Sequence, residues 1–110
     1  MNGEVKFGKT TKTLYGKIKV DIPYGISEDF NLAYYILKSE IEIDGIKTDT
    51  YGIQVEKAYL SGEYEPEIES IPDISLEKHL VEALLNKLHQ GMFTPKTMSE
   101  IVEDYIEKIA

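Results

Sequence analysis

The fold of this chain is decided by its C-terminal third, residues 75–110, which read SLEKHLVEALLNKLHQGMFTPKTMSEIVEDYIEKIA. Apolar residues recur there in two sets, at three- and four-residue steps, which places each set on one face of a helix. The first set is Leu76, Leu80, Val81, Leu84, Leu85 and Leu88, and the second is Met98, Ile101, Val102, Tyr105, Ile106 and Ile109. We therefore predict two amphipathic helices whose apolar faces must be buried against the rest of the chain.

Residues that favour helix ends mark the boundaries of this helix pair. Ser75 is suited to the N-cap of the first helix, and Gly91 to the left-handed residue that follows it. Thr94 and Pro95 are suited to the N-cap and the first helical residue of the second helix. The helix pair is therefore expected to occupy residues 75–110.

Residues 12–60 have the two-residue alternation of an antiparallel sheet. One strand is predicted over 13–22 and a longer one over Phe30–Ile43, whose apolar phase switches near Lys38. Either both faces of that strand are partly covered or a bulge re-phases it. The chain is expected to start with a flexible segment over 1–11.

Asp44-Gly45 predicts a tight hairpin that leads to a third strand ending near Tyr59. A two-residue turn would place Glu40 opposite Asp49, and like charges in that position are unfavourable. A longer loop with a shifted register therefore remains an alternative.

A chain of 110 residues forms one domain. The acidic segment over 61–74 contains two prolines and is expected to be a connector without regular structure. We therefore predict an α+β fold, in which an antiparallel meander of about three strands is followed by an αα-hairpin packed on one sheet face.

Composition excludes several classes of function. The chain has no cysteine, which excludes disulfides and thiolate metal sites. It has no arginine and a net charge of −8, which argues against a nucleic-acid partner. No segment has the length and apolarity of a membrane span or a signal peptide, so we expect no membrane association and a cytoplasmic location.

Gly3-Glu4-Val5-Lys6-Phe7-Gly8-Lys9-Thr10 has the spacing of a phosphate-binding P-loop. That loop requires a strand before its first glycine and a helix after its threonine. Only two residues precede Gly3, and the residues after Thr10 alternate like a strand. We therefore expect no nucleotide binding.

No other pattern predicts catalysis, a metal site or a cofactor. His79 and His89 would lie roughly 15 Å apart along the first helix, on its polar side, and cannot share a metal. The carboxylates around residues 63–73 and on the last helix are expected to be solvated. A DNA-binding helix–turn–helix is also disfavoured, because the exposed face of the last helix is acidic and phosphates would repel it.

Several segments together resemble a family of small uncharacterised proteins from Gram-positive anaerobic bacteria. That family has a Tyr-Gly-Ile-Glu strand and a closing helix that begins with Ser-Pro. The similar segments here are Tyr34-Tyr35-Ile36-Leu37, the Asp-Gly hairpin, Thr50–Lys57, Val81–Leu85, Thr94-Pro95 and Glu100–Ile106. The resemblance covers roughly residues 30–109 and leaves the first 25 residues outside. It implies the fold and brings no known activity.

These observations favour a small protein-binding or regulatory module without catalytic activity. The second strand has apolar residues on both faces, and two helices can cover only one of them. The candidate interaction surface is Tyr35, Leu37, Ile41 and Ile43, which would bind a protein partner or a second copy in a homodimer. The alternative is an enzyme or small-ligand binder with a pocket between sheet and helices, lined by Tyr34, Tyr51 and Tyr105.

Overall fold

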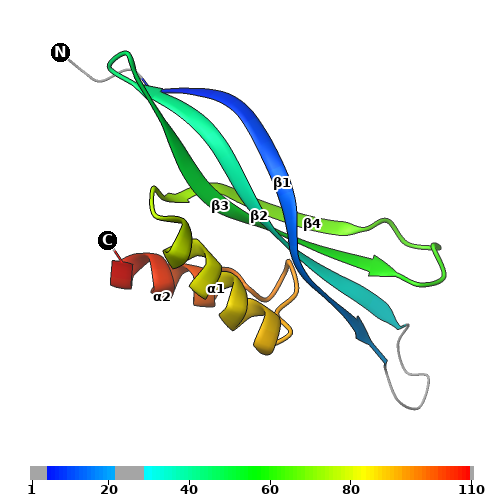
Figure 1. Ribbon diagram of the computed structural model, residues 1–110. Coiled ribbons are helices and arrows are strands. Elements are labelled where there is room, and N and C mark those ends of the chain that lie inside the picture. The colour runs from blue at the N-terminus through cyan, green and yellow to red at the C-terminus, as the bar shows by residue number, and fades with distance from the viewer. Residues whose placement is uncertain (1–4, 22–28, 110) are drawn as a thin grey trace.

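The computed structural model describes residues 5–21 and 29–109 and has an α+β fold. A four-stranded antiparallel sheet, with strands in the order β1-β2-β3-β4, carries two helices on one side (Figure 1). The elements are β1 (Val5–Val20), β2 (Phe30–Ile43), β3 (Ile46–Tyr59), β4 (Glu67–Ser75), α1 (Lys78–Gln90) and α2 (Ser99–Ile109). The predicted class is confirmed, and the predicted number of about three strands is corrected to four.

The central hairpin of β2 and β3 has the two-residue turn expected from Asp44-Gly45. Asp44 and Gly45 both have positive φ, 52° and 81°, as a type I′ turn requires. Glu40 does lie opposite Asp49. Diagonal lysines offset this like-charge pair, because Lys47 lies 3.8 Å from Glu40 and Lys38 lies 3.6 Å from Asp49. The alternative with a longer loop and a shifted register is therefore excluded.

The apolar phase switch in β2 does not come from a bulge. The pairing of β2 with β3 runs without interruption from Phe30↔Tyr59 to Ile43↔Ile46. We call the side of the sheet that carries the helices the inner face and the opposite side the outer face. Leu32 and Tyr34 are buried on the inner face, whereas Leu37 and Ile41 are buried on the outer face. Both faces are therefore covered, each over a different half of the strand.

Strand β1 begins earlier than the sequence indicated. Residues 5–11, assigned above to a flexible start, belong to this strand and pair with β2. The register with β2 shifts twice, between Phe7 and Thr10 and between Leu14 and Gly16. Such irregularities obscure the two-residue alternation from which a strand is recognised. Residues 1–4 and the predicted strand end at Ile22 lie outside the described residues.

Strand β4 occupies most of the segment predicted to be a connector. It pairs with β3 from Lys57↔Glu67 to Tyr51↔Ser75. Pro72 is tolerated because β4 lies at the edge of the sheet, where one side of the strand needs no ladder hydrogen bonds. The predicted connector is therefore corrected to a turn followed by a fourth strand.

Helix α1 begins later than the cap at Ser75 predicts. Its N-cap is Glu77, and Ser75 is the last residue of β4. The hydroxyl of Ser75 still accepts a hydrogen bond from the backbone N–H of Glu77, at 3.1 Å. Leu76 precedes the helix and is 56% exposed, so it does not belong to the apolar face.

The connection between the helices also differs from the prediction. Gly91 has φ −85°, and the left-handed residue is Met92, with φ 52°. Glycine is needed at 91 for space, because a Cβ there would lie 2.4 Å from the ring of Phe93. Thr94 and Thr97 form a separate hydrogen-bonded turn, so Pro95 precedes α2 by four residues instead of beginning it.

The core lies between the inner face and the helices. Four sheet residues and six helix-side residues form it, all fully or almost fully buried: Leu32, Tyr34, Ile53, Val55, Val81, Leu84, Leu85, Leu88, Met98 and Val102. The helices cover the middle of a long sheet, and the molecule measures 59 × 28 × 21 Å (Figure 1). Among the residues that the structure describes, no helix has the length and apolarity needed to cross a membrane.

Candidate binding groove beside strand β4

The four residues of the predicted interaction surface differ in accessibility. Leu37 and Ile41 are 4% and 3% exposed, so neither is available to a partner in this conformation. Tyr35 is half-buried, and the Nζ of Lys12 lies 4.4 Å from the centroid of its ring. Ile43 is exposed beside the hairpin turn. The structure therefore leaves two separated side chains of this set accessible.

The outer face is covered at Leu37 because strand β4 crosses it. Leu37 pairs with Gly52, and a Cβ at Gly52 would lie 2.0 Å from the carbonyl oxygen of Ile71. The missing side chain lets the β4 backbone pass over the sheet at this point. The register of β4 with β3 shifts at the same place, between Tyr51 and Ile53.

Another part of the outer face carries a hydrogen-bonded polar network. The Nζ of Lys12 lies 2.9 Å from a carboxylate oxygen of Glu56, which also accepts a 2.6 Å hydrogen bond from Gln54. Ser70 on β4 donates in turn to the side-chain carbonyl of Gln54, at 2.8 Å. The hydrogen bond to Glu56 raises the pKa of Lys12. These paired polar groups therefore connect β1, β3 and β4 across the outer face.

The three tyrosines of the alternative pocket are not directed at a common cavity. The buried hydroxyl of Tyr34 donates a 2.7 Å hydrogen bond to the carbonyl oxygen of Phe93, and burial raises the pKa of Tyr34 to about 12. The hydroxyl of Tyr105 donates to the carbonyl oxygen of Leu80 at 2.6 Å, and burial raises its pKa as well. Both hydroxyls therefore satisfy backbone carbonyls, while Tyr51 is half-buried beside the core.

The two histidines have different environments. His79 is exposed and lies 3.9 Å from a carboxylate oxygen of Glu77. His89, expected on the polar side of its helix, is half-buried with its ring edge-on to Tyr34 and Tyr15 at centroid distances of 5.5 and 6.2 Å. It packs over Gly16, where a Cβ would lie 3.1 Å from its Nε2. His89 therefore has a packing role between α1 and β1.

The P-loop-like motif does not have the geometry of a phosphate site over its described part. Residues 5–10 form the start of β1, and the strand continues past Thr10 without a helix. Gly3 and Glu4 lie outside the described residues.

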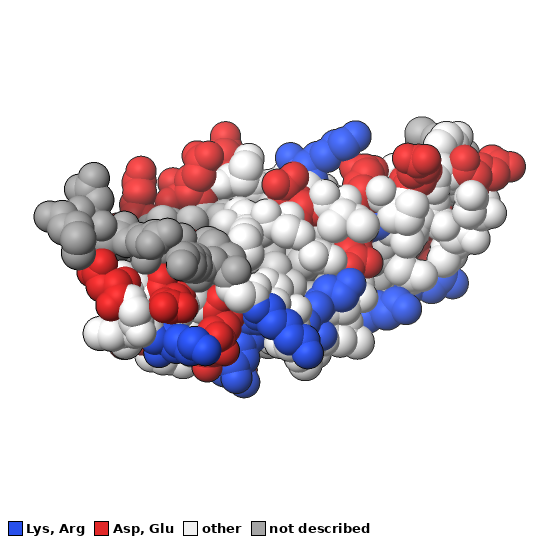
Figure 2. Space-filling view, turned by 90° about the horizontal axis from the view of Figure 1, so that it is seen from above, with Lys and Arg blue, Asp and Glu red and all other residues white. Residues whose placement is uncertain are grey.

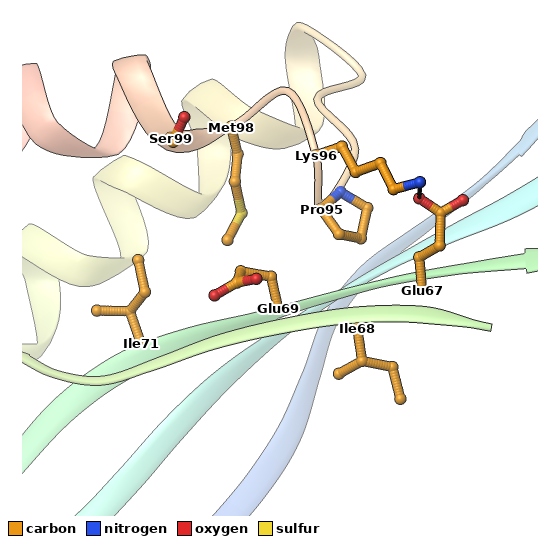
Figure 3. A pocket seen from close by; sticks show the side chains of 8 residues that line it. All are labelled: Glu67, Ile68, Glu69, Ile71, Pro95, Lys96, Met98 and Ser99. Carbon is orange, nitrogen blue, oxygen red and sulfur yellow. Dashed lines mark ion pairs between the residues drawn. The ribbon is translucent and has the colours of Figure 1, made fainter.

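The feature best suited to binding is a hollow between β4 and the segment that leads into α2. It has a volume of about 500 Å³ and is open to solvent. We call it the β4 groove. Figure 3 shows its lining, which is Glu67, Ile68, Glu69 and Ile71 from β4, and Pro95, Lys96, Met98 and Ser99 from the opposite wall.

The base of the β4 groove is apolar and one end carries a neutralised carboxylate. Met98 and Pro95 are buried, and Ile71 is half-buried against the core. The carboxylate of Glu67 lies 3.5 Å from Lys96 and 3.8 Å from Lys57, and it accepts a 3.1 Å hydrogen bond from Tyr59. Glu67 therefore needs no further cation.

Glu69 differs from Glu67 in having no such partner. Its carboxylate lies between β4 and Met98, directed into the groove (Figure 3). It makes no hydrogen bond or ion pair with any residue in the described ranges. The groove therefore offers an available negative charge next to an apolar surface.

The groove runs along a free strand edge. β4 is the last strand of the sheet, so one side of it pairs with no strand of the described chain. Residues 67–71 precede the shift in register and keep regular pairing with β3. Glu67, Glu69 and Ile71 lie on the inner face, whereas Ile68 lies on the outer face and points away from the groove (Figure 3).

Sequence reasoning missed this site because it treated the β4 segment as a connector. The signal was present in the alternation of Glu67, Ile68, Glu69, Ser70 and Ile71, but acidic residues are uncommon in strands and the two prolines favoured a loop. The opposite wall could not be derived from the sequence, because it depends on how far α2 lies from β4.

Comparison with known proteins gives a family without an assigned activity. No curated protein and no solved structure matches this chain. The model of a family of unknown function, DUF6514, matches residues 12–108. This range includes most of β1, which the resemblance drawn from the sequence had left outside. The match spans nearly the whole chain, and the protein therefore belongs to DUF6514, a family of unknown function.

Proposed function

We propose that this protein is a non-catalytic protein-binding module that takes up an extended segment of a partner protein. The segment would pair with the free edge of β4 and direct alternate side chains into the β4 groove. The observation that carries this proposal is the coincidence of a regular free edge over residues 67–71 with a hollow of about 500 Å³ on its inner side. Strand addition of this kind uses backbone hydrogen bonds for affinity and pockets for specificity.

The two edges of the sheet are not equivalent, which supports β4 as the binding edge. β1 carries five lysines and no acidic residue, and its pairing is interrupted twice. Lysines and bulges on an edge strand discourage the addition of another strand. β4 has no lysine, and its irregularity begins only after Ile71.

A small-molecule ligand is the second candidate for the same groove. The volume of about 500 Å³ is within the range of ligand pockets. The lining, however, offers only one unpaired charged group, Glu69, and no set of polar groups that converge on a point. The groove is also open along the strand, which suits a chain better than a compact ligand.

The proposal can be tested with an unbiased peptide library. Random twelve-residue peptides displayed on phage are selected against the protein, and the bound peptides are mapped on it by NMR chemical-shift changes. We expect changes in the backbone amides of residues 67–71 and in Lys96–Ser99. Peptides that map elsewhere, or a selection that enriches none, would contradict the proposal. Native mass spectrometry of protein purified from its host tests the small-ligand candidate, which would appear as an added mass.

A further inference from the structure

We infer that the segment bound at β4 is a basic extended segment of a separate protein, with the pattern apolar–any–Lys/Arg–apolar. This inference rests on the proposed function and assigns the chemistry of its partner. It follows from the side chains that β4 presents, in order, on its two faces.

On the inner face, the partner segment should present an apolar residue and a cationic residue two positions apart. In a strand paired with β4, the residue opposite Ile71 would lie over the apolar base formed with Met98 and Pro95. The residue opposite Glu69 would meet an unpaired carboxylate. Residues opposite Ile71 and Glu69 point to the same face because side chains alternate along a strand. A cation opposite Glu69 satisfies the only charge in the groove that its neighbours leave unpaired.

The outer face adds a second apolar position. Ile68 is 55% exposed on that face and points away from the groove (Figure 3). A β-branched residue opposite Ile68 would cover it through a cross-strand pair. The position opposite Ser70 is unconstrained, because Ser70 is already hydrogen-bonded to Gln54.

The direction of the added strand sets the order of the pattern. The sheet is antiparallel throughout, and an antiparallel addition continues its ladder. The partner then passes Ile71 first, Ser70 next, Glu69 third and Ile68 last. Read from its N-terminus, the segment is therefore apolar, any residue, Lys or Arg, and apolar.

The charge distribution of the whole molecule agrees with a basic partner. Residues 61–77 contain six acidic residues and no lysine. In Figure 2 most of the visible lysines lie along the lower side of the view, whereas acidic side chains are more numerous along the upper side, where blue side chains also appear, and at the left end. Approach of a cationic segment to the acidic side is favoured by the long-range field.

The test uses a pair of fluorescein-labelled peptides that differ by one charge. The first contains Gly-Thr-Val-Thr-Lys-Val-Thr-Gly, and the second has Glu in place of Lys. Fluorescence anisotropy of the full chain at low salt should show binding of the Lys peptide and little binding of the Glu peptide. Methylation of the backbone nitrogens of the Lys peptide should abolish binding, because a strand addition depends on those donors.

Substitutions at Glu69 then test whether the lysine of the peptide lies beside this carboxylate. Glu69→Gln should weaken the affinity for the Lys peptide about two- to fivefold, as expected for loss of one partly exposed ion pair. Glu69→Lys should reverse the preference, so that the Glu peptide binds better. Glu65→Lys changes the net charge equally outside the groove and should keep the original preference. Equal weakening by Glu65→Lys and Glu69→Lys would overturn the inference, because attraction would then be unspecific.

The remaining outcomes separate the inference from the proposed function. If peptides selected from the random library map to β4 but lack the basic pattern, the inference is wrong and the proposed function stands. If no peptide maps to β4, both are wrong. Sedimentation velocity of the protein alone tests whether a second copy of the chain binds at β4. Self-association that Glu69→Lys abolishes would identify such a copy and overturn the inference that the partner is a separate protein.

Discussion

Among the glycines that the structure describes, Gly52 has the closest neighbours around its absent side chain. It is buried in β3, where β4 crosses the outer face of the sheet. The atoms nearest to its absent side chain belong to the backbone of Ile71 and Pro72, which cannot rotate away as a side chain could. Gly52 therefore controls how closely β4 approaches the sheet and where its regular pairing stops.

Replacement of Gly52 by alanine should destabilise the protein by about 1–3 kcal/mol or more, as overpacking of a dense core does. Gly8→Ala is the matched control, since a Cβ at Gly8 makes only ordinary contacts, at 3.4 Å or more, within the same sheet. Urea denaturation followed by circular dichroism measures both. An unchanged midpoint for Gly52→Ala would show that β4 does not pack over Gly52 in solution.

Tyr34 gives a prediction for alkaline pH. Burial raises the pKa of its folded-state hydroxyl from 10.0 to about 12, so the folded chain retains a proton that the unfolded chain loses. Stability from Tyr34 is complete below pH 10 and is lost as the pH rises from 10 to about 12, by an amount on the order of 2–3 kcal/mol. Absorbance titration at alkaline pH should show a tyrosine component near pH 12. That component should vanish in Tyr34→Phe and persist in Tyr64→Phe, because Tyr64 is exposed.

At the scale of elements, α1 supplies most of the cover for the inner face. Its buried residues are Val81, Leu84, Leu85 and Leu88, which follow the helical repeat. α2 packs beside it with Val102 buried, and Met98 is buried just before the helix begins. The β4 groove stays open beside this start of α2. The helix pair therefore closes the core, and the segment that joins the two helices forms one wall of the candidate site.

Leu84→Ala should lower the free energy of unfolding by about 2–5 kcal/mol, because Leu84 is fully buried at the centre of the α1 face. Leu76→Ala removes the same atoms from an exposed side chain and should change the free energy of unfolding by less than about 0.5 kcal/mol. Chemical denaturation distinguishes the two. Equal effects would mean that Leu76 joins the apolar face in solution.

Strand β1 gives a prediction about nucleotides. Because residues 5–10 are extended and continue as a strand, the P-loop-like motif lacks the helix that would hold a phosphate. Addition of magnesium and ATP should therefore shift the melting temperature by less than about 1 °C, as expected when no ligand binds the folded state. A larger shift that disappears in Lys9→Ala would refute this expectation.

The helices and strands differ in how closely their bounds could be predicted from the sequence. β2, β3 and their turn could be predicted almost to the residue, because alternation and Asp44-Gly45 are local signals. β4 could not be predicted in this way, because its close packing on the sheet depends on the absence of a side chain at Gly52 in β3. Helix α1 ends before Gly91 as predicted, but both helices begin later than Ser75 and Thr94 indicated. Ser75 is the last residue of β4, and Thr94 forms a separate hydrogen-bonded turn with Thr97. The β4 groove could not be predicted, because it lies between β4 and the segment before α2, and neither was placed correctly from the sequence.

At the scale of the whole molecule, the helices cover only part of a long sheet. The core residues gather around Leu32, Tyr34, Ile53 and Val55, near the middle of the strands. The hairpin turn of β2 and β3 extends beyond them and exposes Ile43 and Ile46 (Figure 1). The cover that the helices give therefore decreases along the sheet toward the hairpin turn, where we expect local opening to be easier.

Hydrogen exchange should reproduce this gradient. Amides of residues 32–36 are expected to exchange only through global unfolding, whereas amides of residues 42–47 should exchange much faster through local fraying. Exchange measured by NMR at several denaturant concentrations separates the two routes. Equal protection at both places would mean that something covers the hairpin turn in solution.

The strand order β1-β2-β3-β4 follows the order of synthesis, which has a consequence for the nascent chain. Each strand finds its neighbour as soon as both have left the ribosome, because no crossover delays the pairing. The residues that cover Leu32, Tyr34, Ile53 and Val55 belong to α1, α2 and the segment between them, and they are synthesised after the sheet. A growing chain that has completed the sheet therefore exposes the apolar inner face until translation has passed Val102. Such exposed apolar surface favours aggregation during that interval.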